Sequence, residues 1–244
     1  MNKAVQCALG MTLVMTCAFG FDDDKKGLQA VPSVFVGTAP GCAPFPPGSN
    51  IVTSAWLAGM GLPDNGSSNV TPSTPPNTDP HLGLLLSKNG ATADCSAAQA
   101  TITGAPAITI SATTEFGFDY RNGGHCGAGA PRFNITTDDN VTHFGGCAGG
   151  TKTPAPQDPA QWTRVRLLPA QFFPPMLPGA KVKDIGIVFD EGTDSTSTDD
   201  PSGVGLAVID NIDINGQLIT KGKNQKDDND DNDQGKGNNK DKDK

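Results

Sequence analysis

The chain has 244 residues, enough for one large domain or two small ones, and carries a formal net charge of −8. The charges of residues 1–26 cancel, as do those of residues 221–244, so the excess of negative charge falls entirely on the segment between them. An acidic body excludes nucleic acid as the expected partner, because phosphate binding requires basic side chains, and it also argues against adhesion to anionic lipid.

The first twenty residues have the pattern of a secretory signal peptide. Lys3 is followed by an uncharged apolar run over residues 4–18, which is too short to span a membrane, and then by DDDKK. Small residues near position 20 fit a cleavage site, so residues 1–20 are the predicted signal peptide and residues 21–29 a charged linker. Cleavage before Cys17, as in a lipoprotein, is the alternative. The mature chain is therefore expected outside the cell or in the periplasm, without a membrane span.

Residues 30–220 form a single predicted domain built from strands. Helical periodicity is nearly absent, whereas short β-rich segments alternate with turn-forming residues, a pattern typical of an antiparallel sandwich or barrel. Segments 53–59 and 96–100 have the pattern of one or two helical turns, and Pro-rich stretches 61–80 and 151–159 are expected to be loops. The expected strands cover residues 81–87, 107–111, 115–120, 132–137, 162–168, 182–190 and 206–214.

Four cysteines remain after the predicted signal peptide. An even number in an exported chain predicts two disulfides, with three possible pairings. The most economical pairing joins Cys126 to Cys147, which flank a predicted hairpin, and Cys42 to Cys95, which would tie the N-terminal arm to the body.

The segment FDYRNGGHCGAGAPRFNI, residues 118–135, concentrates unusual residues and includes the only tyrosine of the chain. Its two ends are predicted strands joined through a glycine-rich turn, where glycine permits positive φ. The predicted strand residues Phe118 and Phe133 are expected to point into the core. Tyr120, Arg121 and His125 then remain as candidate functional groups at the end of the hairpin.

The predicted strand WTRVRLL places three notable side chains on one face. Side chains alternate along a strand, so Trp162, Arg164 and Arg166 share a face opposite the expected core face. One interpretation is that the arginine stems cover a solvated sheet. The other is a ligand face, on which the indole stacks against a sugar ring and the arginines bind hydroxyls or carboxylates. On the second interpretation, Tyr120 and Arg121 join these three as expected ligand-binding residues.

The segment from residue 184 to residue 214 holds eight acidic residues and no lysine or arginine. Crowded carboxylates must spread into solvent, become protonated or share a cation, and oxygen ligands of this kind suit Ca²⁺. We therefore expect a calcium site formed by Asp190, Glu191, Asp194 and Asp210. The alternative is that the acids of the loop are merely solvated, while Asp210 caps backbone N–H groups.

Asp199 and Asp200 lie farther along the same loop and are weaker candidates for calcium binding. Carboxylates near this loop also leave open a polysaccharide hydrolase, since an acid pair can catalyse glycoside hydrolysis. The sequence contains none of the common zinc-protease, serine-hydrolase or phosphate-loop motifs.

The last 24 residues, from Lys221, contain no apolar side chain. Such a segment cannot bury surface to offset the entropy of ordering, so this tail is expected to be disordered.

The strand LAVIDNIDING, residues 206–216, follows the acid-rich loop and resembles the last strand of jelly-roll carbohydrate-binding modules and galactose-binding-domain-like sandwiches. The resemblance implies a jelly-roll-like β-sandwich with a structural calcium ion. It also implies that the chain is a secreted, non-catalytic binding module for an extracellular glycan or protein. A polysaccharide hydrolase and a structural surface protein are the alternatives.

Overall fold

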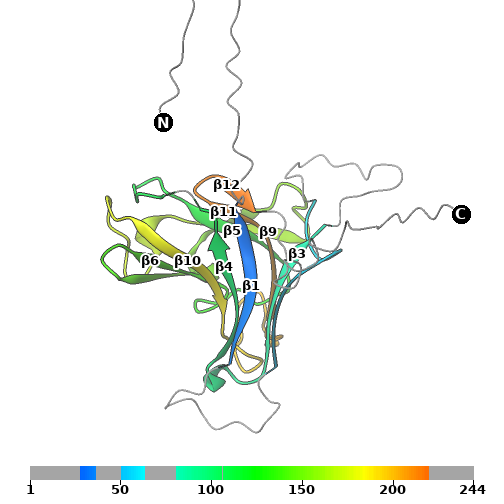
Figure 1. The fold of residues 1–244 in the computed structure, drawn as a ribbon. Coiled ribbons are helices and arrows are strands. Elements are labelled where there is room, and N and C mark those ends of the chain that lie inside the picture. The colour runs from blue at the N-terminus through cyan, green and yellow to red at the C-terminus, as the bar shows by residue number, and fades with distance from the viewer. Residues whose placement is uncertain (1–27, 37–50, 64–80, 106, 220–244) are drawn as a thin grey trace, which may run out of the picture.

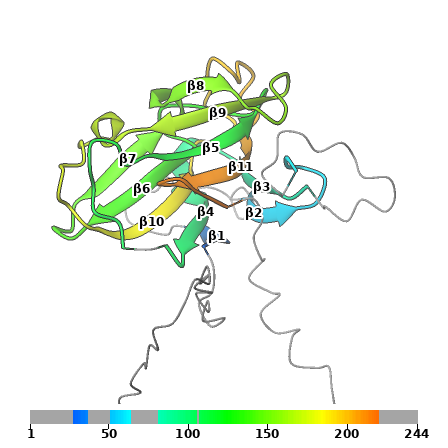
Figure 2. The ribbon, with the colours of Figure 1, turned by 90° about the horizontal axis from the view of Figure 1, so that it is seen from above.

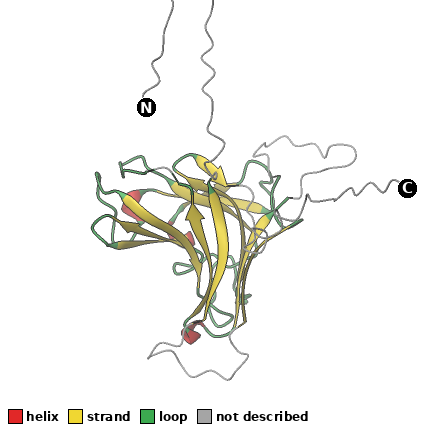
Figure 3. Ribbon diagram, in the orientation of Figure 1, coloured by secondary structure: helices red, strands yellow, loops and turns green. Residues whose placement is uncertain are grey.

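The computed structural model describes residues 28–36, 51–63, 81–105 and 107–219, and these residues form strands and loops (Figure 3). Helical structure within them is limited to three single 3₁₀ turns, at Thr92–Asp94, Cys147–Gly149 and Pro169–Gln171. None of the helices in this part of the chain is long and apolar enough to cross a membrane. The predicted signal peptide and tail lie outside the described residues, as does most of the predicted linker.

The strands form two antiparallel sheets packed against each other, which confirms the predicted all-β sandwich (Figures 1 and 2). Sheet A has five strands in the order β1-β4-β10-β6-β7. Sheet B has seven, in the order β2-β3-β11-β5-β9-β8, with β12 paired to β11. The bounds are β1 Gln29–Val36, β2 Ile51–Leu57, β3 Gly83–Asn89, β4 Ser96–Thr103, β5 Phe116–Arg121, β6 Arg132–Thr137, β7 Thr142–Gly146, β8 Thr151–Pro154, β9 Trp162–Leu167, β10 Val182–Phe189, β11 Leu206–Ile214 and β12 Gln217–Ile219.

The connections give this sandwich its jelly-roll character. Consecutive described strands pair only as β2 with β3, β6 with β7, β8 with β9, and β11 with β12. Everywhere else the chain crosses from one sheet to the other, as in a long hairpin rolled into two layers. Figure 2 shows β8, β9 and β5 side by side in one layer, with β6, β10 and β4 in the other.

The core lies between the sheets and is centred on aromatic side chains from β5 and β6. Phe116, Phe118, Phe133 and Ile135 are all fully buried, which confirms that these strand faces point inward. The ring centroid of Phe133 lies 5.7 Å from that of Phe118 and 6.0 Å from that of Phe116, and both pairs are tilted. Inclined contacts at these distances are the favourable arrangement for aromatic rings.

Several expected elements differ from the structure. Segments 53–59 and 96–100, expected to be helical, lie largely or wholly in strands β2 and β4. The expected loop 151–159 begins with strand β8. Residues 107–111 form no strand, although an isolated bridge between Thr109 and Lys181 and backbone hydrogen bonds to residues 179–182 hold them in place. In β2 and β4, pairing with neighbouring strands outweighs the local preferences of alanine and serine, because strand propensity depends strongly on packing.

Candidate functional site

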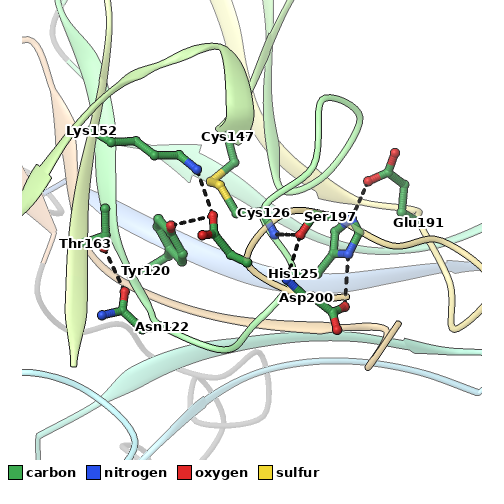
Figure 4. The surroundings of a disulfide bond; sticks show 11 residues. Tyr120, Asn122, His125, Cys126, Cys147, Lys152, Thr163, Glu191, Ser197 and Asp200 are labelled. Atoms are coloured by element: carbon green, nitrogen blue, oxygen red, sulfur yellow. Dashed lines mark hydrogen bonds and ion pairs between the residues drawn. A yellow bond between two sulfur atoms is a disulfide. The ribbon is translucent and has the colours of Figure 1, made fainter. Parts of the chain in front are cut away.

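The disulfide predicted between Cys126 and Cys147 is present, with a Cα–Cα distance of 5.2 Å (Figure 4). It joins the loop after β5 to the 3₁₀ turn after β7. Cys95 is also disulfide-bonded. Its expected partner, Cys42, lies outside the described residues, so that pairing stays a prediction.

Trp162 lies on the outer face of sheet B, but it is covered. Only 4% of its surface is exposed, because it packs with Leu62, Ala155 and Val208 in a small apolar cluster outside the main core. The indole therefore supports the loops that cover this face and is not presented for stacking on a ligand.

The two arginines that share the face of Trp162 neutralise buried carboxylates. Arg164 donates Nε to Oδ1 of Asp119 at 2.9 Å and Nη2 to Oδ2 at 3.1 Å, and this interaction raises the pKa of Arg164. Arg166 lies 3.4 Å from an oxygen of Asp213, and its burial lowers the pKa of the guanidinium. Asp119 also stands directly opposite Asp210 in the neighbouring strand, where two carboxylates would repel each other. These arginines thus stabilise sheet B by pairing with its own carboxylates.

Two of the four predicted calcium ligands bind protein groups at separate places. Asp190 forms a bidentate ion pair with Arg132, in which Nη2 donates to Oδ2 at 2.7 Å. Asp194 accepts hydrogen bonds from the backbone N–H and the hydroxyl of Thr92 at 2.8 and 2.7 Å. The Thr92 contact lowers the pKa of Asp194.

The other two predicted ligands have further partners. Asp210 accepts a hydrogen bond from the backbone N–H of Leu62 at 2.7 Å, which fits the expected capping role. Glu191 hydrogen-bonds His125 at 2.6 Å. Throughout the described residues, no three His, Cys, Asp or Glu side chains are placed to share a metal ion. The four carboxylates therefore do not converge on one site, and calcium binding stays a prediction.

The hairpin expected at residues 118–135 is not formed, because β5 lies in sheet B and β6 in sheet A. His125, in the loop between these two strands, is fully buried and joins that loop to the acidic loop between β10 and β11 (Figure 4). Its Nε2 contacts Glu191, and its Nδ1 lies 3.2 Å from Oδ2 of Asp200. Burial alone would raise the pKa of Asp200, but hydrogen bonds from Val204 and His125 lower it overall. Asp200 is only 1% exposed, so it anchors this loop and is not solvated, contrary to the alternative interpretation of the acidic loop.

Asp199, the neighbour of Asp200, points to a different cluster. Its Oδ2 accepts hydrogen bonds from the hydroxyl of Tyr120 at 2.9 Å and from Nζ of Lys152 at 2.8 Å (Figure 4). The same Nζ lies 5.4 Å from the centroid of the Tyr120 ring. With Thr163, these residues line an open depression of about 270 Å³ at one end of the sandwich. We call it the Tyr120 depression.

Strand register and loop anchoring together position this cluster. Tyr120 on β5 stands opposite Thr163 on β9, and β8 places Lys152 beside them at the edge of sheet B. The loop that carries Asp199 is fixed by Ser197, whose hydroxyl accepts hydrogen bonds from the backbone N–H groups of Cys126 and Asp200. The disulfide and His125 therefore stabilise the position of Asp199.

The charges of the Tyr120 depression are stable near neutral pH. Burial and the contact with Asp199 raise the pKa of Tyr120, and the hydrogen bond from Lys152 lowers the pKa of Asp199. Burial alone would lower the pKa of Lys152, but its contact with Asp199 raises it overall. Lys152 and Asp199 thus stabilise each other's charged forms.

Arg121, the last predicted ligand residue, is exposed at the end of β5. Since consecutive residues of a strand face opposite ways, Arg121 and Tyr120 do not share a site. Arg121 borders a second depression of about 250 Å³, which we call the Arg121 depression. The sequence indicated both residues, but not their separation.

No protein-family model matches the chain, and neither the curated proteins nor the solved structures include a significant match. The resemblance to carbohydrate-binding modules therefore rests on the sequence pattern.

Proposed function

We propose that this protein is an exported, non-catalytic binding module that recognises a neutral extracellular glycan through the Tyr120 depression. The observation that carries the proposal is the fixed pair of Lys152 and Asp199, 2.8 Å apart, at an open depression beside a threonine hydroxyl. The disulfide between Cys126 and Cys147 supports export, because such bonds persist in oxidising compartments.

The chemistry of the Tyr120 depression suits sugar hydroxyls. A hydroxyl both donates and accepts hydrogen bonds, so it can bind an ammonium group and a carboxylate that lie side by side. Pro154 and Pro159 add apolar wall for the C–H face of a sugar ring. The volume of about 270 Å³ falls just below the range of roughly 300–1,000 Å³ for drug-sized ligands, which favours one sugar unit of a chain.

Replacing Lys152 tests this proposal on an array of neutral oligosaccharides. We expect Lys152→Ala to weaken binding by roughly tenfold or more, since a hydrogen bond to a charged group is lost. The matched control is Lys183→Ala, which removes an exposed lysine of sheet A that hydrogen-bonds Asn140. Wild-type protein that binds no neutral glycan, or binding that survives Lys152→Ala, would contradict the proposal.

A further inference from the structure

Arg121 differs from the other arginines of the chain. Arg132, Arg164 and Arg166 each form an ion pair with an aspartate. The Arg121 guanidinium is exposed and makes no hydrogen bond or ion pair with any residue that the structure describes. In a body with excess negative charge, this side chain is a cationic group left available for a ligand.

The Arg121 depression combines this guanidinium with an apolar floor. Tyr120 pairs with Ile209 on β11, so the next residue, Arg121, lies beside Val208. Leu206 and Val208 line the depression together with Met60, and no acidic residue is among the described residues that line it. A ligand with both an anionic group and an apolar face matches such a surface.

The wall formed by the turn after β5 is held in place. The Asn122 backbone N–H donates to the carbonyl of Gln161 at 2.8 Å, and its side-chain oxygen accepts a hydrogen bond from Thr163 at 2.7 Å. Gly123 has a φ of +84°, and the space on its side-chain side is open, with no described atom within 4 Å of the place that a Cβ would occupy. A ligand can therefore approach the backbone of the turn closely, and little ordering is needed on binding.

We propose that the Arg121 depression binds a ligand with a single carboxylate next to an apolar ring face, the chemistry of a hexuronic acid. The guanidinium takes the carboxylate through two parallel hydrogen bonds, a geometry that lysine cannot reproduce. The ring face lies on Leu206 and Met60, which are partly exposed, whereas Val208 beneath them is only 3% exposed. A single carboxylate is specified because the acidic body repels polyanions. This site is separate from the Tyr120 depression and does not depend on the function proposed for it.

The test is an NMR titration of isotope-labelled protein with glucuronic acid. We expect saturable shifts of the Gly123 and Gly124 amide signals. The methyl ester of the same sugar lacks the charge, and acetate lacks the ring, so each should bind roughly tenfold more weakly or worse. Arg121→Ala should abolish the shifts, whereas Arg121→Lys should retain part of the affinity because the charge remains.

Two control variants test whether the shifts caused by glucuronic acid arise from binding at the Arg121 depression. Lys183→Ala and Lys152→Ala should both leave the glucuronic acid shifts intact, because neither residue lines the Arg121 depression. The side chain of Arg121 has no described partner, so its replacement should not change the melting temperature. Equal affinity for the ester or for acetate, shifts that persist in Arg121→Ala, or no shifts in the wild-type protein would each overturn the proposal.

Discussion

One buried lysine shows how hydrogen bonds and an ion pair allow a charged side chain to be buried in this fold. Lys88 is fully buried on the inner side of β3, and its Nζ lies 2.7 Å from Oδ1 of Asp94. The same nitrogen donates to the backbone carbonyls of Thr92 and Asp190 at 2.9 Å each. All three protons of the ammonium group therefore have acceptors, which is the condition for burying such a charge.

The pair of Lys88 and Asp94 predicts a loss of stability in acid. Burial alone would raise the pKa of Asp94, but hydrogen bonds from Lys88 and Ser96 lower it overall. A carboxylate whose pKa is lower in the folded state stabilises the fold above its unfolded pKa, near 3.9, and this contribution is lost as the pH falls through the folded value. We expect the free energy of unfolding, measured in urea, to decrease below about pH 4.

The variant Asp94→Asn isolates this effect. It removes the titrating group and leaves the buried lysine without a counter-charge, so the protein should be less stable at pH 7 and its stability should vary less between pH 5 and pH 3. Asp184→Asn, at an exposed position of β10, is the matched control and should keep the wild-type pH profile. Parallel pH profiles for wild-type and Asp94→Asn protein would refute the assignment.

At the scale of elements, β4 depends on small side chains. It pairs with β1 on one side and β10 on the other, and Ala98 and Ala100 are buried between the sheets. Ala100 stands opposite Pro32 and Ile187 in the two neighbouring strands. The alanines that suggested a helical turn therefore fit the narrow space inside the sandwich.

A larger side chain in β4 should disturb this packing. We expect Ala100→Leu to lower the free energy of unfolding by about 1–3 kcal/mol, because added methyl groups in a dense core force neighbouring side chains out of their rotamers. Thr101→Leu, at the next and exposed position of the strand, should change stability by less than about 0.5 kcal/mol. Equal effects of the two changes in urea unfolding would show that the inner face of β4 is not tightly packed.

The strands that the sequence predicted correctly differ in kind from those that it missed. Strands at 132–137 and 206–214 have the predicted bounds, because each has alternating or β-branched apolar residues bounded by turn formers. The strand at 96–103 has mostly alanine and small polar residues, and only its two neighbours reveal it. Local pattern therefore identifies strands that carry their own apolar side chains and misses those defined by pairing.

The candidate sites could be predicted only in part for a similar reason. Strand alternation correctly placed Trp162, Arg164 and Arg166 on one face, and cysteine spacing predicted the disulfide between Cys126 and Cys147. The acidic residues that bind the side chains of the candidate sites lie far from those side chains in the sequence. Asp199, for example, binds Tyr120 across 79 positions. No local pattern contains such contacts, which arise when the two sheets and the acidic loop come together.

For the whole molecule, the disulfide between Cys126 and Cys147 is the covalent link across the end that carries the Tyr120 depression. The two cysteines are 21 positions apart, and a loop of that size predicts a stabilisation of about 3 kcal/mol from restriction of the unfolded chain. The variant with Cys126→Ala and Cys147→Ala should therefore unfold at lower guanidinium concentration. It should keep its β-sheet circular dichroism, since the strands pair without the bond.

The same variant should also bind neutral glycan more weakly. The backbone N–H of Cys126 donates to Ser197 in the loop that carries Asp199, so freeing the loop between β5 and β6 loosens the acceptor beside Lys152. Cys95→Ala, which breaks the other disulfide and leaves the bond between Cys126 and Cys147, is the control and should keep the wild-type binding of neutral glycan. Unchanged glycan binding by the variant would contradict this role of the disulfide, because the contacts of His125 with Glu191 and Asp200 and the hydrogen bond from Tyr120 to Asp199 would then suffice to position the loop.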